Sequence, residues 1–213
     1  MNKQRLEAFS DGVFAIAITL LILDIRLPEV EYNQLKTSLP KIIPNLLSYA
    51  MSFIVIGLYW MFHHQYTDRL KRINRPFMFL NLLNLLIISF MPFPTSLLGK
   101  YSFTTIPVLI YGFTLMIANL TGFLTVYYVT RHEDLSDGLI NKAYLRTQYP
   151  MYIAVNSVYL VAFVVAFFAP KISFAMYAGV LGMLIIRALK NRDIAVCEPA
   201  KPKYTSATSS QPV

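Results

Sequence analysis

Charged residues fall in clusters along this chain, and long stretches without any charge separate the clusters. Four of these stretches contain 21, 24, 30 and 24 residues, and they are Ile42–Phe62, Pro76–Gly99, Tyr101–Thr130 and Thr147–Pro170. A helix of about 20 residues crosses the roughly 30 Å hydrocarbon core of a bilayer, because each residue adds about 1.5 Å. The pattern therefore predicts four transmembrane helices over these ranges.

A fifth charge-free stretch, Ile172–Ile186, has only 15 residues. Lys171 and Arg187 flank it, and the long side chains of both residues can extend toward the bilayer surface. This extension lengthens the segment that a membrane tolerates. We therefore expect a transmembrane helix here as well.

The first apolar segment, Gly12–Leu23, has 12 residues and is bracketed by Asp11 and Asp24. By length alone it could be the apolar part of a signal peptide or a re-entrant segment. No small-residue cleavage site follows it, and Leu27-Pro28-Glu29 indicates the end of a helix. We therefore interpret this segment as the first of six transmembrane helices.

The distribution of basic residues predicts the orientation of these six helices. With six spans, 14 of the 19 Lys and Arg residues lie on the side that holds both termini and the second and fourth loops. Cytoplasmic loops carry such an excess, so we expect both termini in the cytoplasm. A five-span topology would move Lys3 and Arg5 to the other side and weaken the asymmetry.

Composition supports a membrane protein, since 56% of the residues are apolar and only 14% are charged. The topology and the lipid head groups account for the net charge of +8, and no basic stripe with interleaved aromatic residues indicates nucleic-acid binding. The single cysteine, Cys197, allows no internal disulfide. We expect a transmembrane domain over residues 1–190 and a disordered cytoplasmic tail over residues 191–213.

The sequence is poor in groups that catalyse reactions or bind metals. His63 and His64 are adjacent, so they point about 100° apart on a helix and cannot chelate a metal as a pair four residues apart would. No HExxH, GxSxG or glycine-rich phosphate loop is present. We therefore expect neither an enzyme nor a bound metal or cofactor.

Polar residues of the first three spans fall at the same predicted depth, near the cytoplasmic boundary of the membrane. Two interpretations of such residues remain open: hydrogen bonds that hold the helices together, or a direct path for protons or ions. Interhelical hydrogen bonding is the commoner role. The residues concerned are Arg5, Ser10, Asp11, Trp60, His63, His64, Asn81 and Asn84.

An apolar stripe follows one side of the first span. Its members are Ile16, Leu20, Leu23 and Leu27, at spacings of 4, 3 and 4 residues, and Thr19 lies beside Leu20. A short helix with charged ends and an apolar middle suits a water-accessible axis. The same periodicity also fits a helix buried in its own bundle, and the pattern does not choose between them.

The segment Arg5-Leu6-Glu7-Ala8-Phe9-Ser10-Asp11 resembles the RxxxFSD signature of the transmembrane protein 175 family of potassium channels. Trp60 and His64 at the end of the second span, and the Asn-rich third span with Met91-Pro92-Phe93-Pro94-Thr95, are also similar to that family. The resemblance implies a homotetramer of six-helix subunits around a pore lined by the first helices.

For individual residues, the resemblance implies a hydrophobic constriction that begins at Ile16 and continues with Thr19, Leu20 and Leu23. It also implies a bonded cluster behind the pore helix, formed by Arg5, Ser10, Asp11, Trp60 and His64. Either Asn81 or Asn84 fits as the amide partner from the third span. The family lacks the TVGYG filter of ordinary potassium channels, and so does this sequence.

We therefore predict an all-α protein with six transmembrane helices per subunit, assembled as a homotetramer in the cell membrane and permeable to potassium and other monovalent cations. The alternative is a secondary transporter or proton-coupled carrier that uses Asp11 and His64. Transporters usually show inverted repeats or helices broken at the membrane midplane. The Gly and Pro positions Pro44, Gly57, Pro107 and Gly112 show no such pairing.

Overall fold

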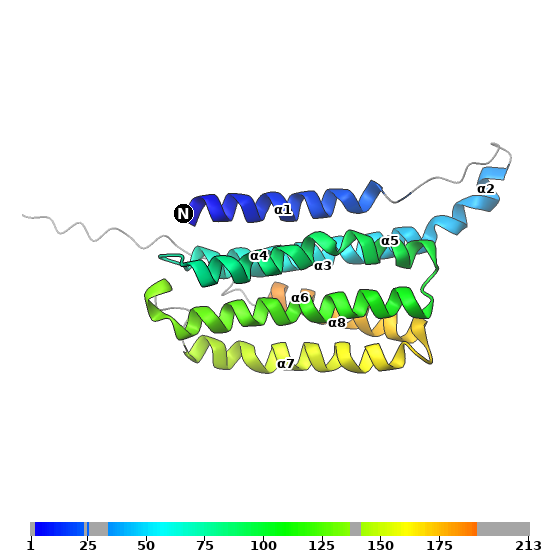
Figure 1. Cartoon of the computed structure of the whole chain (residues 1–213). Helices are drawn as coiled ribbons and strands as arrows, with labels where there is room; N and C mark the ends of the chain where they lie inside the picture. The colour runs from blue at the N-terminus through cyan, green and yellow to red at the C-terminus, as the bar shows by residue number, and fades with distance from the viewer. Residues whose placement is uncertain (1–2, 24, 26–33, 137–141, 191–213) are drawn as a thin grey trace, which may run out of the picture.

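The structure, a computed structural model, describes residues 3–23, 25, 34–136 and 142–190 (Figure 1). The predicted tail over residues 191–213 lies outside the described residues. Within these ranges the chain is almost entirely helical, and six helical segments are long and apolar enough to cross a membrane. The prediction of an all-α chain with six membrane-spanning helices is confirmed.

The described residues form ten helical elements. In chain order they are α1 (Lys3–Leu23), α2 (Leu35–Ser38), η2 (Leu39–Ile42), α3 (Ile43–Asp68), α4 (Arg75–Phe90), α5 (Pro92–Lys100), α6 (Thr105–Arg131), η3 (Glu133–Leu135), α7 (Lys142–Val165) and α8 (Pro170–Lys190). The six spans are Lys3–Leu23, Leu39–Asp68, Arg75–Lys100, Thr105–Arg131, Gln148–Val165 and Pro170–Lys190.

The first span is longer than its charge-free stretch, because α1 continues through the charged residues before Gly12. Its 21 residues correspond to a length of about 31 Å, enough for the hydrocarbon core. Lys3 and Glu7 form an ion pair one turn apart, with 3.4 Å between Nζ and Oε1. These two charges therefore lie in the first turns of α1 and are paired with each other.

The third span consists of two helices, α4 and α5, which meet at Met91. Pro92 and Pro94 lack a backbone N–H, so the helical hydrogen bonds cannot continue unchanged through this point. The Thr95 hydroxyl lies 2.8 Å from the carbonyl oxygen of Met91. The sequence predicted one helix over Pro76–Gly99, and the structure corrects it to two helices within one span.

The helices run roughly parallel to one another in a bundle (Figure 1). α1 packs against α3, α4 and α5, whereas α6 packs against α4, α5, α7 and α8. Half of the α6 span is buried, so α6 lies at the centre of the subunit, and α1 and α7 lie at its edges. The hydrophobic core includes Phe14, Ile56, Ile88 and Tyr111, each no more than 1% exposed.

Ten of the described basic residues lie at one end of the bundle, which we call the basic end. This end holds the start of α1, the α3–α4 connection, the last turns of α6 and α8, and the beginning of α7. Lys3 Nζ donates to the carbonyl oxygen of Asp68 at 2.8 Å, which joins the start of α1 to the end of α3. The basic residues are Lys3, Arg5, Arg69, Lys71, Arg72, Arg75, Arg131, Arg146, Arg187 and Lys190.

Candidate functional site: the first helix and its polar contacts

One face of α1 is buried against the rest of the subunit. Its residues are no more than 2% exposed and recur at spacings of 4, 4, 3 and 4, which is the period of a helix. They are Leu6, Ser10, Phe14, Ala17 and Leu21. This face is apolar except for Ser10, so burial against α3, α4 and α5 holds α1 in place.

The predicted constriction residues lie on the other face of α1, which no described part of the subunit covers. The exposed fractions are 60% for Ile16, 42% for Leu20 and 69% for Leu23, and Thr19 is exposed beside them. The stripe is therefore not part of the core of its own subunit. The Thr19 hydroxyl lies 3.0 Å from the Ala15 carbonyl oxygen and 2.9 Å from the Ile16 carbonyl oxygen.

A buried row of hydrogen bonds, which we call the inner chain, joins α1, α4 and α3. The Ser10 hydroxyl donates to the Leu6 carbonyl oxygen at 2.9 Å, and Asn81 Nδ2 donates to Ser10 Oγ at 3.1 Å. Asn81 Oδ1 then lies 2.6 Å from His63 Nε2. Because the amide oxygen can only accept, His63 donates through Nε2.

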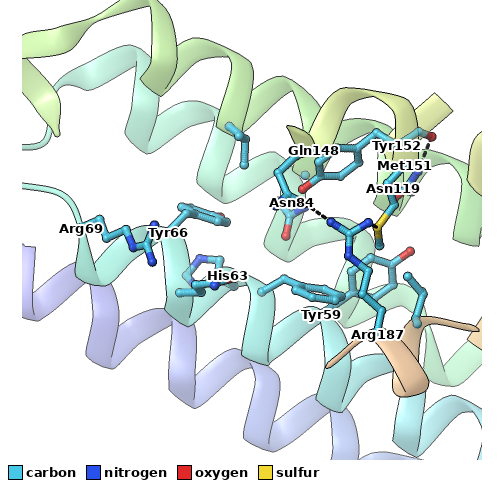
Figure 2. A pocket seen from close by; sticks show the side chains of 15 residues that line it. Tyr59, His63, Tyr66, Arg69, Asn84, Asn119, Gln148, Met151, Tyr152 and Arg187 are labelled. Carbon is cyan, nitrogen blue, oxygen red and sulfur yellow. Dashed lines mark hydrogen bonds between the residues drawn. The ribbon is translucent and has the colours of Figure 1, made fainter. Parts of the chain in front are cut away.

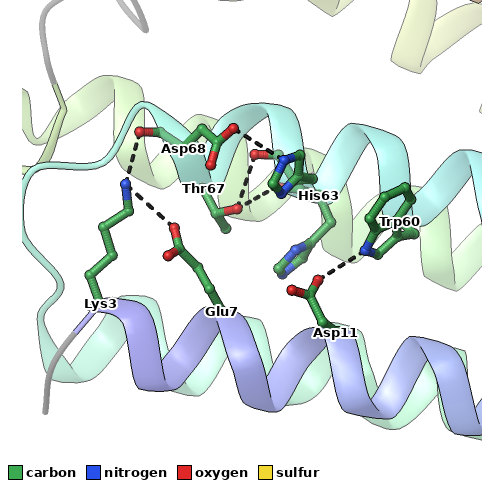
Figure 3. Close-up of polar contacts among 8 residues, drawn as sticks. Lys3, Glu7, Asp11, Trp60, His63, Thr67 and Asp68 are labelled. Carbon is green, nitrogen blue, oxygen red and sulfur yellow. Dashed lines mark hydrogen bonds and ion pairs between the residues drawn. The ribbon is translucent and has the colours of Figure 1, made fainter. Parts of the chain in front are cut away.

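A second group of contacts lies at the surface of the subunit (Figure 3). It joins Asp11, Trp60, His64 and Asp68, and we call it the outer set. Trp60 Nε1 donates to Asp11 Oδ1 at 2.9 Å. The Trp60 ring stacks on His64, with 5.6 Å between centroids and 13° between planes. His64 Nε2 in turn lies 3.2 Å from Asp68 Oδ2, and both of these side chains are about half exposed.

The structure thus divides the predicted polar cluster into two groups. Ser10 and Asn81 belong to the inner chain, and Asp11, Trp60 and His64 belong to the outer set. Asn84 forms no hydrogen bond to either group among the described residues, and its Nδ2 donates to Thr121 Oγ1 on α6 at 3.0 Å. Of the two asparagines that the sequence left open, Asn81 is therefore the one that contacts α1.

Arg5 does not join either group among the described residues. Arg5 lies about 140° around the helix from Ser10 and about 120° from Asp11, and its side chain is exposed. It lies only about 20° from Ile16, so it shares the uncovered face of α1. Within one subunit, the predicted bonds of Arg5 to the cluster are not formed.

His63 was among the polar residues predicted near the cytoplasmic boundary, but the cluster implied by the resemblance did not include it. Its side chain is 4% exposed, and its ring lies 5.4 Å from Phe14 of α1 and 5.0 Å from Tyr66. The two adjacent histidines point about 100° apart on the helix, and His63 faces the interior whereas His64 lies at the surface. Over the described ranges, no group of three or more His, Cys, Asp or Glu residues could hold a metal ion.

These features define the class of the protein, which is a multi-pass membrane protein with six spans. One face of its first helix packs against the rest of the subunit, and the opposite face is uncovered. A family model described as "Endosomal/lysosomal potassium channel TMEM175" matches residues 5–92. This range includes α1 from Arg5 onward, α3 and α4, and it contains every residue of the inner chain and the outer set.

Two bacterial relatives are similar to the chain. A protein of Chryseobacterium sp. (strain P1-3), named a potassium channel, is 34% identical over 177 residues, which cover 83% of this chain and 89% of the relative. A protein of Streptomyces collinus (strain DSM 40733 / Tue 365), also named a potassium channel, is 48% identical over 103 residues. That match covers 47% of this chain and 50% of the relative.

A solved structure has the same fold. The lysosomal potassium-selective channel TMEM175 homologue from Chamaesiphon minutus superposes with a TM-score of 0.76 and 30% identity. The match covers 87% of this chain and 97% of the other. The chain belongs to the TMEM175 family, whose members are ion channels and not enzymes.

Proposed function

We propose that the chain forms a potassium-permeable cation channel, a homotetramer around a central pore lined by α1. The uncovered face of α1 supports this proposal, because it combines an apolar stripe at Ile16 with a charged group at Arg5 and a polar group at Thr19. Charged groups are costly against lipid, so this face is better suited to water and neighbouring subunits. The relatives' description as potassium channels supports the choice of ion.

Assembly follows from the geometry of a pore. A single helix cannot enclose an aqueous path, so several copies of α1 are needed around one axis. The resemblance to the TMEM175 channels supports four copies, which brings four Ile16 side chains together. The uncovered Arg5 is then available to a neighbouring subunit.

The ring of Ile16 side chains acts as a hydrophobic constriction. Branched apolar side chains offer no oxygen to replace the hydration shell of an ion, so a narrow ring excludes water and closes the path. When the ring widens, a partly hydrated ion passes. Potassium loses water more readily than sodium, so this pore prefers potassium without a TVGYG filter.

The hydroxyl oxygen of Thr19 provides a contact for the ion just beyond the constriction. Its hydroxyl hydrogen points to backbone carbonyl oxygens of its own helix turn, as the two distances of about 3 Å indicate. The lone pairs of the oxygen therefore face away from the backbone and can contact a partly dehydrated cation. Leu20 and Leu23 continue the apolar lining beyond this point.

The basic end of the bundle faces the cytoplasm. Its ten described basic residues contrast with Lys36, Lys41, Lys100 and Lys171 at the opposite end, which is the asymmetry of cytoplasmic loops. Residues 1–190 form the channel domain in the cell membrane, with a cytoplasmic tail over residues 191–213. The channel requires no cofactor, and potassium is the permeant species.

The structure gives less support to a carrier that uses Asp11 and His64 as one proton site. Asp11 bonds to Trp60, whereas His64 pairs with Asp68, so the two groups have separate partners. The third span is broken at Met91, but a carrier with inverted repeats would need a second broken span at the matching position.

Recording from the purified chain in planar bilayers tests the proposed function. A channel gives unitary current steps, and its reversal potential follows the potassium gradient with no proton gradient present. Bilayers without protein, prepared with the same detergent, are the control. A flux without unitary steps, whose reversal potential shifts with a proton gradient at fixed potassium, would support the carrier instead.

A further inference from the structure

A second feature lies away from the uncovered face of α1. A cavity of about 240 Å³ opens between α3, α4, α6, α7 and α8 (Figure 2). The cavity is therefore large enough for several water molecules or for a small polar group.

The cavity runs inward from the basic end. One wall extends from Arg69, the residue that follows the end of α3, to Tyr59, ten residues earlier and so about 15 Å deeper. Arg187, which bonds to Gln148, lies near Tyr59 (Figure 2), so polar groups also line the deeper part of the cavity. Phe62 and Leu184 add apolar lining.

Arg187 is the main charge in the cavity. The sequence suggested that this residue extends outward beside the last span, but the structure turns it inward, where it is half-buried. One guanidinium nitrogen donates to Gln148 Oε1 at 2.9 Å, and another contacts Met151 Sδ. Both partners are neutral, and no carboxylate in the described ranges lies within 4.0 Å.

The other polar groups of the cavity are rich in hydrogen-bond donors. The Tyr66 side chain is 6% exposed, and its hydroxyl has no hydrogen-bond partner among the described residues. Arg69, Gln65 and the Asn119 amide also line the space, and none of the described lining residues is acidic. A half-buried arginine in a membrane span without a counter-charge is costly, so a bound anion would stabilise it.

We propose that this cavity binds a phosphate group, supplied either by an anionic phospholipid of the leaflet at the basic end or by free inorganic phosphate. The planar guanidinium of Arg187 fits two phosphate oxygens at once, and Gln148 and Met151 occupy only two of its five N–H donors. The Tyr66 hydroxyl supplies a further donor. If the source is a lipid, its acyl chains stay in the bilayer.

Binding to the purified full-length chain in mild detergent tests this site in two arms. In the first, native mass spectrometry measures retention of dioleoylphosphatidylglycerol against dioleoylphosphatidylcholine. In the second, the melting midpoint is followed while inorganic phosphate replaces chloride at constant ionic strength. Saturable binding in the first arm identifies a lipid phosphate, and saturable binding in the second identifies the free anion.

Three variants assign the binding to this cavity. Arg187→Gln should weaken binding about tenfold, because a charge-assisted pair is lost, and Arg187→Lys should weaken it less. Tyr66→Phe keeps the shape of the side chain and should weaken binding a few-fold. Lys190→Gln removes an exposed charge from the same helix and should leave binding unchanged.

Three results would each overturn the proposal. The first is the absence of saturable binding in both arms with the parent chain. The second is equal binding by the parent, by Tyr66→Phe and by whichever Arg187 variant folds. The third is an equal loss of binding in Arg187→Gln and Lys190→Gln. Because none of these measurements involves ion flux, they are independent of the channel proposal.

Discussion

Trp60 Nε1 donates a hydrogen bond to Asp11 Oδ1 at 2.9 Å, and this contact joins α3 to α1 at the surface of the subunit. Trp60 is 39% exposed and Asp11 is exposed as well. The bond therefore lies beside the uncovered face of α1 and not in the core. In the proposed tetramer, it fixes the side of α1 that meets the next subunit.

Asp11→Ala should reduce tetramer formation, because Trp60 then loses its acceptor at the subunit boundary. The expected loss is about 1 kcal/mol per subunit, the usual net contribution of a hydrogen bond. Native mass spectrometry of the oligomers measures it. Asp11→Asn keeps an acceptor oxygen and should assemble better than Asp11→Ala. A stable Asp11→Ala tetramer without ion flux would contradict this role and indicate that Asp11 lies on the ion path.

Asn81→Leu should loosen α1, because it leaves both Ser10 and His63 without their partner in the inner chain. Buried polar groups that lose a hydrogen bond cost about 1–3 kcal/mol each. Hydrogen–deuterium exchange over Lys3–Leu23 should accelerate. Asn84→Leu is the matched control, because Asn84 bonds to Thr121 and should leave exchange of α1 unchanged. Equal acceleration in both variants would show that the inner chain does not hold α1.

Ile16→Asn should increase current and weaken the preference for potassium over sodium, because an amide at the constriction lowers the cost of wetting. Conductance and reversal potentials in planar bilayers measure both. Ile22→Asn is the control, since Ile22 is 48% exposed and lies about 120° around the helix from Ile16. Leu21 is opposite the stripe but only 2% exposed, so its substitution would disturb folding. Unchanged conduction in a folded Ile16→Asn tetramer would remove Ile16 from the pore.

Gly112→Ala should destabilise the subunit, because an added Cβ would collide with the hydroxyl and ring of Tyr177 where α6 meets α8. Overpacking of this kind costs about 1–3 kcal/mol. Gly182→Ala is the control, since no atom lies within 4 Å of its added Cβ and alanine favours a helix. Melting midpoints compare the two. A Gly112→Ala chain as stable as Gly182→Ala would mean that Tyr177 moves aside freely.

Cysteine labelling tests the orientation. In a Cys197→Ser background, a membrane-impermeant maleimide added to intact cells should modify Lys100→Cys and leave Lys71→Cys unmodified, because Lys71 lies at the basic end and Lys100 at the other. Both positions should react in permeabilised cells. Labelling of Lys71→Cys in intact cells would reverse the proposed topology.

The six spans were predictable because lipid admits few charges, so charge-free stretches mark the helices directly. The charge-free stretch alone underestimates the first helix, since charges at a helix end do not interrupt it: α1 begins at Lys3 and not at Gly12. The break at Met91 depends on Pro92 and Pro94, which were visible in the sequence.

The partners within the site were less predictable. Asn81 and Asn84 lie only about 60° apart on one helix, so their order along the chain does not decide which one contacts α1. Which asparagine contacts α1 depends on how far α1 is shifted along α4, and this shift is set by the packing of the whole subunit. Arg187 was misplaced for the same reason, because its direction depends on the position of Gln148 on α7.

The direction of the inner chain determines how it responds to a proton. Ser10 donates to Leu6 and Asn81 donates to Ser10, so Asn81 Oδ1 remains an acceptor and His63 must carry hydrogen on Nε2. A neutral imidazole in this tautomer and a positively charged imidazolium both provide that hydrogen. Protonation of His63 would therefore break no hydrogen bond of the inner chain.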